Sequence, residues 1–178
     1  TISGSVASGA LIKLNGADYV TFDGSNSGGA DRSLTIVNSS ITAPTVISVA
    51  SLGTGLGSNN NTIKNCNLST GVAASLGYGI SIGGNTPGTA GDDNDNTTIQ
   101  NNSISIAPIG IYATASATGV NDNLNIIGNT VTYNGALASI GIQVGQANNC
   151  LISQNTVDEQ TSASQSPTAI SLETGFLN

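Results

Sequence analysis

Short segments in which apolar and polar residues alternate recur along the chain, and each ends in a turn rich in Asn, Ser or Gly. The pattern is clearest in residues 124–157, where an aliphatic residue is followed by two positions, then Asn, a small polar residue and another aliphatic residue. It recurs in LTIVNSSIT, NTIKNCNLS, TTIQNNSIS, LNIIGNTVT and CLISQNTVD. A period of two is typical of a strand with one buried face, so these segments predict β-strands.

Two families of strands alternate along the sequence. The first has aliphatic anchors 28 to 35 residues apart, at Ile12, Ile47, Ile80, Ile111, Ile142 and Ile170. The second has anchors 26 to 36 residues apart, at Ile36, Ile63, Ile99, Ile126 and Ile152, each followed five residues later by another aliphatic residue: Ile41, Leu68, Ile104, Val131 and Val157. Residues 19–24 add a strand with Val20 and Phe22 facing inward, which leaves the register of the first coil open.

Self-similarity at 20 to 50 residues indicates a solenoid, and the repeating units here are strands. We therefore expect an all-β fold with almost no helix. The prediction is a parallel β-helix of about six coils, with a period near 30 residues, formed by residues 1–178 as a single domain. Turns between paired strands tolerate insertions. The longest turn, residues 83–96, is expected to protrude into solvent.

One position in each coil predicts an asparagine ladder. The column three residues after each second-family anchor contains Ser39, Cys66, Asn102, Asn129 and Asn155. Stacked Asn side chains can pass amide hydrogen bonds from coil to coil. Cys66 occupies this column and Cys150 lies about three coils away. At about 4.8 Å per coil that separation is too long for a disulfide, so we expect two free, largely buried thiols.

Composition excludes several classes of function. The chain has no His, which removes Ser-His and Cys-His catalysis and histidine zinc sites. Its net charge is −7, and its three cations, Lys13, Arg32 and Lys64, are too few for a nucleic-acid groove. No apolar run approaches the roughly 20 residues of a membrane-spanning helix. Because the sequence begins at Thr1 without a signal-like segment, we expect a processed form or a portion of a longer protein.

The phrases LNGADYVTFDGSN and RSLTIVNSS resemble repeats of large secreted bacterial surface proteins and adhesins. Nearly the whole chain looks like a right-handed parallel β-helix of the pectin-lyase-like superfamily. That superfamily includes lyases, glycoside hydrolases, phage depolymerases, adhesins and stalks, so the resemblance implies a fold without selecting an activity.

Two of those activities have requirements that can be compared with the sequence. Hydrolases of this fold have a cleft flanked by Asp from adjacent coils, whereas the outward column of the first strand family here contains no carboxylate: Lys13, Ser48, Ser81, Tyr112, Gln143 and Ser171. Lyases of this fold use a basic residue near calcium-bound uronate, and Arg32 and Lys13 are the nearby cations. No lyase motif matches this chain.

Candidate chemistry concentrates in one acidic turn. Asp92, Asp93 and Asp95 supply the hard oxygen ligands that calcium prefers, although their spacing does not match the twelve-residue calcium loop. The alternative is a solvated turn. These carboxylates, or Asp18, Asp23, Asp31 and Asp122, could also serve as the acid and base of a glycoside hydrolase, but the sequence selects no pair.

Two surface features suggest binding without catalysis. Tyr78, Tyr112 and Tyr133 could form aromatic platforms for sugars or could be isolated rings that cover coil edges. An outward column of Thr35, Thr62 and Thr98 begins an ice-binding array but continues as Asn125 and Leu151.

Neither end of the chain shows an amphipathic helix or a charged capping segment, although solenoids normally cover their unpaired edges. We therefore expect end-to-end self-association or further β-helix repeats. The function favoured by the sequence is that of a non-catalytic structural protein of the bacterial cell exterior: a segment of a fibre, adhesin or stalk that displays an amide- and hydroxyl-rich surface. The alternative is a carbohydrate-active enzyme or a glycan-binding domain with surface glycans as partners.

Overall fold

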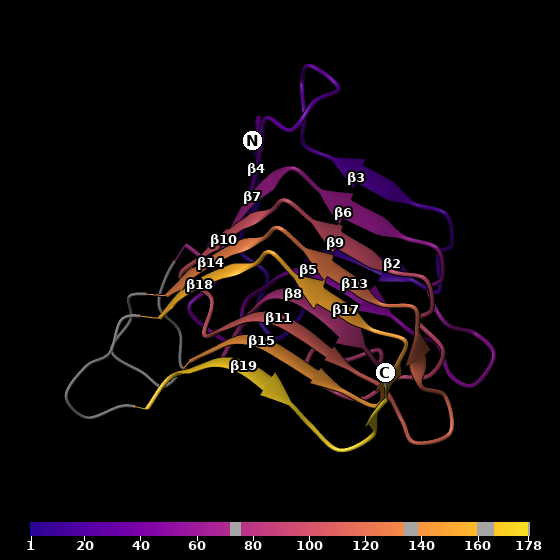
Figure 1. The fold of residues 1–178 in the computed structure, drawn as a ribbon. Helices are drawn as coiled ribbons and strands as arrows, with labels where there is room; N and C mark the ends of the chain where they lie inside the picture. The colour runs from indigo at the N-terminus through magenta and orange to yellow at the C-terminus, as the bar shows by residue number, and fades with distance from the viewer. Residues whose placement is uncertain (72–75, 134–138, 160–165, 178) are drawn as a thin grey trace.

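The computed structural model describes residues 1–71, 76–133, 139–159 and 166–177. Its strands form parallel sheets stacked along one axis, as in a parallel β-solenoid (Figure 1). The described residues contain strands and turns without a helix, so the all-β prediction is confirmed. Accordingly, no helix in this part of the chain has the length and apolar content to cross a membrane.

Three sheets form the faces of the solenoid, and the chain visits them in the order A, B, C in successive coils. Sheet A contains β1 (Ile2–Gly4), β4 (Leu34–Asn38), β7 (Cys66–Ser69), β10 (Ser103–Ser105), β14 (Thr130–Tyr133) and β18 (Thr156–Glu159). Sheet B contains β2 (Ala10–Asn15), β5 (Thr45–Ala50), β8 (Tyr78–Gly83), β11 (Ile109–Thr114), β15 (Ile140–Gly145) and β19 (Thr168–Leu172).

The other two sheets are shorter. Sheet C contains β3 (Thr21–Asp23), β6 (Thr62–Lys64), β9 (Thr98–Gln100), β13 (Asn125–Ile127) and β17 (Leu151–Ser153). Sheet D, at the turn between sheets B and C, contains β12 (Asn121–Asp122), β16 (Ala147–Asn148) and β20 (Phe176–Leu177).

The first strand family is confirmed as sheet B. Its six predicted anchors pair in register through all six strands, and the predicted outward column from Lys13 to Ser171 pairs in the same way. The middle anchors Ile47, Ile80, Ile111 and Ile142 have no exposed surface. Burial between sheets thus explains the aliphatic residue at this position of every coil.

The prediction for the second family is wrong in the first coils. Ile36 pairs with Ile2 and Leu68 in sheet A, and Phe22 takes the predicted place of Ile36 beside Ile63 in sheet C. Both assignments bury an apolar residue every second position, so periodicity alone could not choose between them. Ile41, the aliphatic residue five positions after Ile36, lies in a turn and is 80% exposed.

Three glycines allow sheets A and B to approach closely. Gly79, Gly110 and Gly141 precede the inward Ile of β8, β11 and β15. A Cβ atom at Gly110 would lie 2.4 Å from Val131 Cγ1 and 2.6 Å from the carbonyl oxygen of Gly141, and the other two glycines have equivalent neighbours. The Gly-Ile pair is therefore a packing requirement of these three coils, whereas β5 has Val46 before its inward Ile47.

Candidate functional site

The predicted asparagine column begins at a different residue. Leu34, rather than Ser39, pairs with Cys66, because Ile36 belongs to sheet A. Ser39 instead donates its backbone N–H to Gly4. The column therefore runs from Leu34 and Cys66 to three asparagines, Asn102, Asn129 and Asn155.

The amides of this column bond to one another and to the backbone. Asn129 Nδ2 donates to Asn155 Oδ1 at 3.0 Å and to the Ile99 carbonyl at 2.9 Å, while its Oδ1 accepts from the Asn102 backbone N–H at 2.9 Å. Asn102 Oδ1 in turn accepts from the backbone N–H of Cys66 at 3.0 Å. Asn102 and Asn129 are at most 1% exposed. These side chains satisfy backbone groups that the turn would otherwise leave unpaired.

The acidic turn places its three carboxylates on different partners. Asp92 accepts from Thr54 Oγ1, and Asp93 accepts from the backbone N–H of Gly55, each at 2.7 Å. Asp95 Oδ1 accepts from the backbone N–H of Asp122 at 2.8 Å. Within the described residues, no group of three or more His, Cys, Asp or Glu side chains is placed to hold a metal ion. These hydrogen bonds hold neighbouring turns together, and the calcium site at Asp92, Asp93 and Asp95 stays a prediction.

Asp95 belongs to a stacked column of turn residues that the sequence interpretation missed. The column contains Asp18, Asn59, Asp95, Asp122 and Asn148, and in each case the next residue has a positive φ between 51° and 58°. These residues are separated by 41, 36, 27 and 26 positions, the same spacings that separate Phe22, Ile63, Ile99, Ile126 and Ile152 in sheet C. The shared spacing is the signal that could have revealed the column. The residue that follows the column is Asn in four of the five coils, which suits the left-handed conformation. The column side chains themselves accept backbone N–H groups from the next coil, as Asp18 does from Asn59 and Asn59 does from Asp95.

The electrostatics of this turn follow from its hydrogen bonds and burial. The hydroxyl groups of Ser116 and Thr54 lower the pKa of Asp92, so its carboxylate is charged at neutral pH. Burial raises the pKa of Asp95, and the neighbouring Asp122 and Asp93 carboxylates add to that effect, although the Asp122 backbone N–H opposes it. The column thus contains one pair of like charges in adjacent coils.

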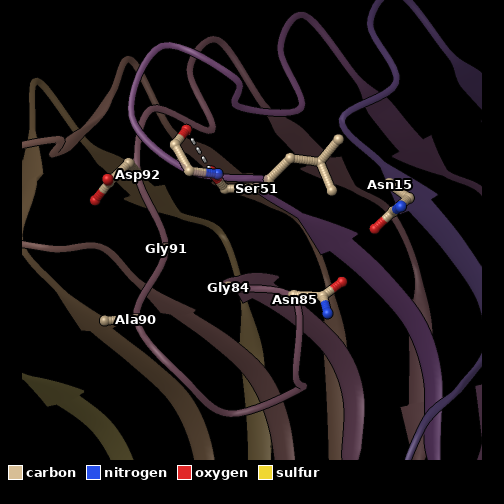
Figure 2. Close-up of a pocket in the computed structure, with 9 residues that line it drawn as sticks. Asn15, Ser51, Gly84, Asn85, Ala90, Gly91 and Asp92 are labelled. Atoms are coloured by element: carbon tan, nitrogen blue, oxygen red, sulfur yellow. Dashed lines mark hydrogen bonds between the residues drawn. The ribbon is translucent and has the colours of Figure 1, made fainter.

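An open groove of about 600 Å³ lies beside this turn, between residues from three coils: Asn15, Ser51, Leu52, Gly53, Gly84, Asn85, Ala90, Gly91 and Asp92. Asn15 and Asn85 lie on one side of the groove and Asp92 on the other (Figure 2). The lining contains a single carboxylate, whereas glycoside hydrolysis uses two on either side of the sugar bond. This arrangement of amides and hydroxyls can hydrogen-bond a polar ligand.

Within the predicted turn 83–96, the segment 84–90 contacts the outer face of sheet B, while Asn85, Thr86, Thr89 and Ala90 are exposed to solvent. Lys13 Nζ donates to Asn85 Oδ1 at 2.6 Å, and Gly88 donates its backbone N–H to Ser81 Oγ at 3.0 Å. Ser48 and Ser81, which the outward column predicts to face solvent, are each 1% exposed. Polar anchors on the strands therefore hold the segment in place.

The three tyrosines that were candidate platforms for sugars are packed within the fold. Tyr78 and Tyr112 pack edge to face on sheet B with ring centroids 5.5 Å apart, and both are buried, as is Tyr133 in β14. None of the three presents an open platform for a sugar.

Arg32, considered above as a catalytic base, donates Nη2 to Asn101 Oδ1 at 2.8 Å. Lys64 forms an ion pair with Asp23 at 3.1 Å. Asp31 accepts hydrogen bonds from Ser25, Ser27 and Ser33, which lower its pKa. These charged groups hold turns together.

The remaining predicted residues are the cysteines and the threonine column. Cys66 and Cys150 are free and buried, and burial raises the pKa of each thiol to about 11. Thr62 and Thr98 pair in sheet C, but Thr21 stands above them in place of the predicted Thr35. Below them the column continues as Asn125 and Leu151, so it forms no extended array of threonines.

Comparison of the chain with models of protein families, with curated proteins and with solved structures found no match.

Proposed function

We propose that this chain is a non-catalytic structural segment of a fibre, adhesin or stalk on the bacterial cell exterior, in which stacked β-coils continue beyond the last coil described. The observation that carries the proposal is the exposure of inward-facing residues at that coil. Ile170 and Leu172 are 45% and 54% exposed, whereas their partners Ile142 and Val144 in the preceding coil are 0% exposed. Further coils, in the same polypeptide or in a second chain, would bury this surface.

Unpaired strand edges support the same function. β18, β19 and β17 end sheets A, B and C on one side of the solenoid, and β1, β2 and β3 end them on the other. Each edge offers backbone groups to a further strand. In this proposal the coils have the right-handed winding of the pectin-lyase-like superfamily, and the Asn102–Asn155 amides act as a ladder that continues into the next coil.

The sequence composition supports an extracellular location. Only 7% of residues are charged, and the surface relies on Asn, Ser, Thr and Gly. Such a surface can present amides and hydroxyls to surface glycans while continuous backbone ladders keep the rod stiff.

The test is electron microscopy and sedimentation velocity of the 178-residue chain. We expect concentration-dependent oligomers or rods, because association would bury the apolar edge. Replacing Ile170 and Leu172 together by Lys should abolish association, since charged side chains block sheet edges. The matched control is Leu52→Lys, because Leu52 is 51% exposed but lies in a turn. A monomer at every concentration, or equal association of both variants, would refute stacking.

A further inference from the structure

The outer face of sheet A carries two straight columns of side chains, formed by the residues on either side of the inward aliphatic residue of each strand. The strands β4, β7, β10, β14 and β18 stack in this order (Figure 1). The first column is Thr35, Asn67, Ser103, Thr130 and Thr156, and the second is Val37, Ser69, Ser105, Thr132 and Asp158. All of these residues except Val37, Asn67 and Asp158 carry a hydroxyl group. The array is distinct from the threonine column of sheet C, because Thr35 belongs to sheet A.

The hydroxyls of this face are accessible from outside. The residues that β4, β7, β10 and β14 contribute to the two columns are all partly exposed. Within the described residues, four of their hydroxyls make no hydrogen bond to another protein group: those of Thr35, Ser103, Thr130 and Thr132. Sheet B differs, because segment 84–90 packs on its outer face and Ser48 and Ser81 are only 1% exposed. Sheet A thus presents free hydroxyls, each able to donate and to accept hydrogen bonds.

The two columns form a regular and rigid lattice. Neighbouring strands of a sheet lie about 4.8 Å apart, and residues i and i+2 of one strand lie about 6.6 Å apart. The register runs from Thr35 to Thr156 without a shift or an insertion, so the spacing repeats on each strand. β7, β10 and β14 pair with a strand on both sides, which fixes their backbones. These intervals are comparable to those between the oxygen atoms at the surface of an ice crystal.

We propose that the outer face of sheet A binds the surface of ice. The hydroxyls take the places of water molecules in the outermost layer of the crystal, while the methyl groups of the threonines and of Val37 pack against that layer. Because the lattice of hydroxyls is fixed before binding, many weak contacts form together at a small cost in conformational entropy. The inference does not depend on the proposed stacking of coils, since the face lies along the side of the solenoid.

The composition of this face favours ice over other partners. The columns from β4 to β14 contain no charged side chain, so ions and nucleic acids would meet no opposite charge. They also contain no aromatic ring for a sugar to stack on and no Trp, Tyr or Arg anchor of the kind that dominates protein interfaces. The outer face of sheet C, in contrast, carries the Lys64–Asp23 ion pair and the aliphatic residue Ile127.

The test measures thermal hysteresis, the gap between the melting and freezing temperatures of a small ice crystal, in solutions of the 178-residue chain. We expect faceted crystals and a measurable gap. Thr130→Lys places a long, charged side chain in the middle of the array and should abolish the gap. Ser103→Lys, on the neighbouring strand, should cause the same loss. The Tm of each variant should stay close to that of the unchanged chain, because neither residue is buried.

Thr98→Lys is the matched control. Thr98 is a partly exposed residue on β9, an inner strand of sheet C, so the same substitution adds the same charge to a different face. It should leave the thermal hysteresis unchanged. Absence of hysteresis in the unchanged chain, or equal loss with Thr98→Lys and Thr130→Lys, would overturn the proposal. So would adsorption of the chain to microcrystalline cellulose without adsorption to ice, since that result would assign the face to a polysaccharide.

Discussion

The middle coils and the last coil have closely similar sequences in sheet B, but the corresponding side chains are buried to different extents. Ile111 in β11 has no exposed surface, whereas Ile170, at the same register in β19, is 45% exposed. The position of Gly110 and Gly141 is taken by Ala169 in β19. An inner strand has neighbours above and below, whereas β19 has one neighbour in its sheet. The stacking partner therefore determines what a given repeat residue contributes to stability.

The largest expected effect tests this comparison directly. Ile111→Ala removes a side chain packed on all sides and should lower the free energy of unfolding by about 2 to 5 kcal/mol. Ile170→Ala removes a half-exposed side chain and should cost less than about 1 kcal/mol in the monomer. Urea denaturation of the two variants measures both values. Equal losses would show that β19 is covered in solution.

The amide column should show the next largest difference. Asn129→Ala deprives two buried groups, the Asn102 N–H and the Ile99 carbonyl, of hydrogen bonds. Each such loss costs about 1 to 3 kcal/mol, so we expect roughly 3 kcal/mol in the same denaturation experiment. Asn155→Ala should cost about 1 kcal/mol, because Asn155 is partly exposed and water can replace its amide. A larger loss for Asn155 than for Asn129 would contradict this ranking.

A smaller effect is expected at the glycine column. Gly110→Ala places a Cβ atom against Val131 and the Gly141 carbonyl oxygen, and overpacking of this kind costs about 1 to 3 kcal/mol. Ala169→Gly, the reverse change in the last coil, should alter stability by only about 0.5 kcal/mol through backbone entropy. Thermal unfolding of both variants compares these costs. If Gly110→Ala were neutral, the close approach of the two sheets would not be a constraint.

The smallest expected effect concerns the paired carboxylates of the turn column. The pKa of Asp95 is raised in the folded protein, so its charged form is disfavoured there. This penalty is fully present above the folded pKa, shrinks as the pH falls through it and vanishes below the unfolded value near 4. Asp95→Asn keeps the acceptor for the Asp122 N–H and should raise the Tm by about 1 °C at pH 7.

The same variant should show no gain at pH 3, which scanning calorimetry at the two pH values can test. Asp92→Asn is the control, because the pKa of Asp92 is lowered rather than raised. Its Tm should fall at pH 7. A rise for both variants would mean that net charge, rather than the position of Asp95, governs stability.

Sequence reasoning succeeded where each coil repeats the same physical requirement. The inward Ile of sheet B must be buried between two neighbours in every inner coil, so its spacing reveals the register without a structure. It failed in the first coil, where Phe22 and Ile36 were equally plausible partners for Ile63. It also missed the turn column, because Asp and Asn in a turn suggested metal ligands rather than side chains that bond to the backbone of the next coil.

By itself, the sequence determined the strand composition, the parallel repeat and the register of sheet B, because burial every second residue and a recurrent spacing are local and periodic properties. Only the tertiary structure decided that Ile36 joins sheet A and that segment 84–90 packs on the outer face of sheet B. Each of these features belongs to one part of the chain and is not repeated from coil to coil, so it leaves no periodic pattern in the sequence.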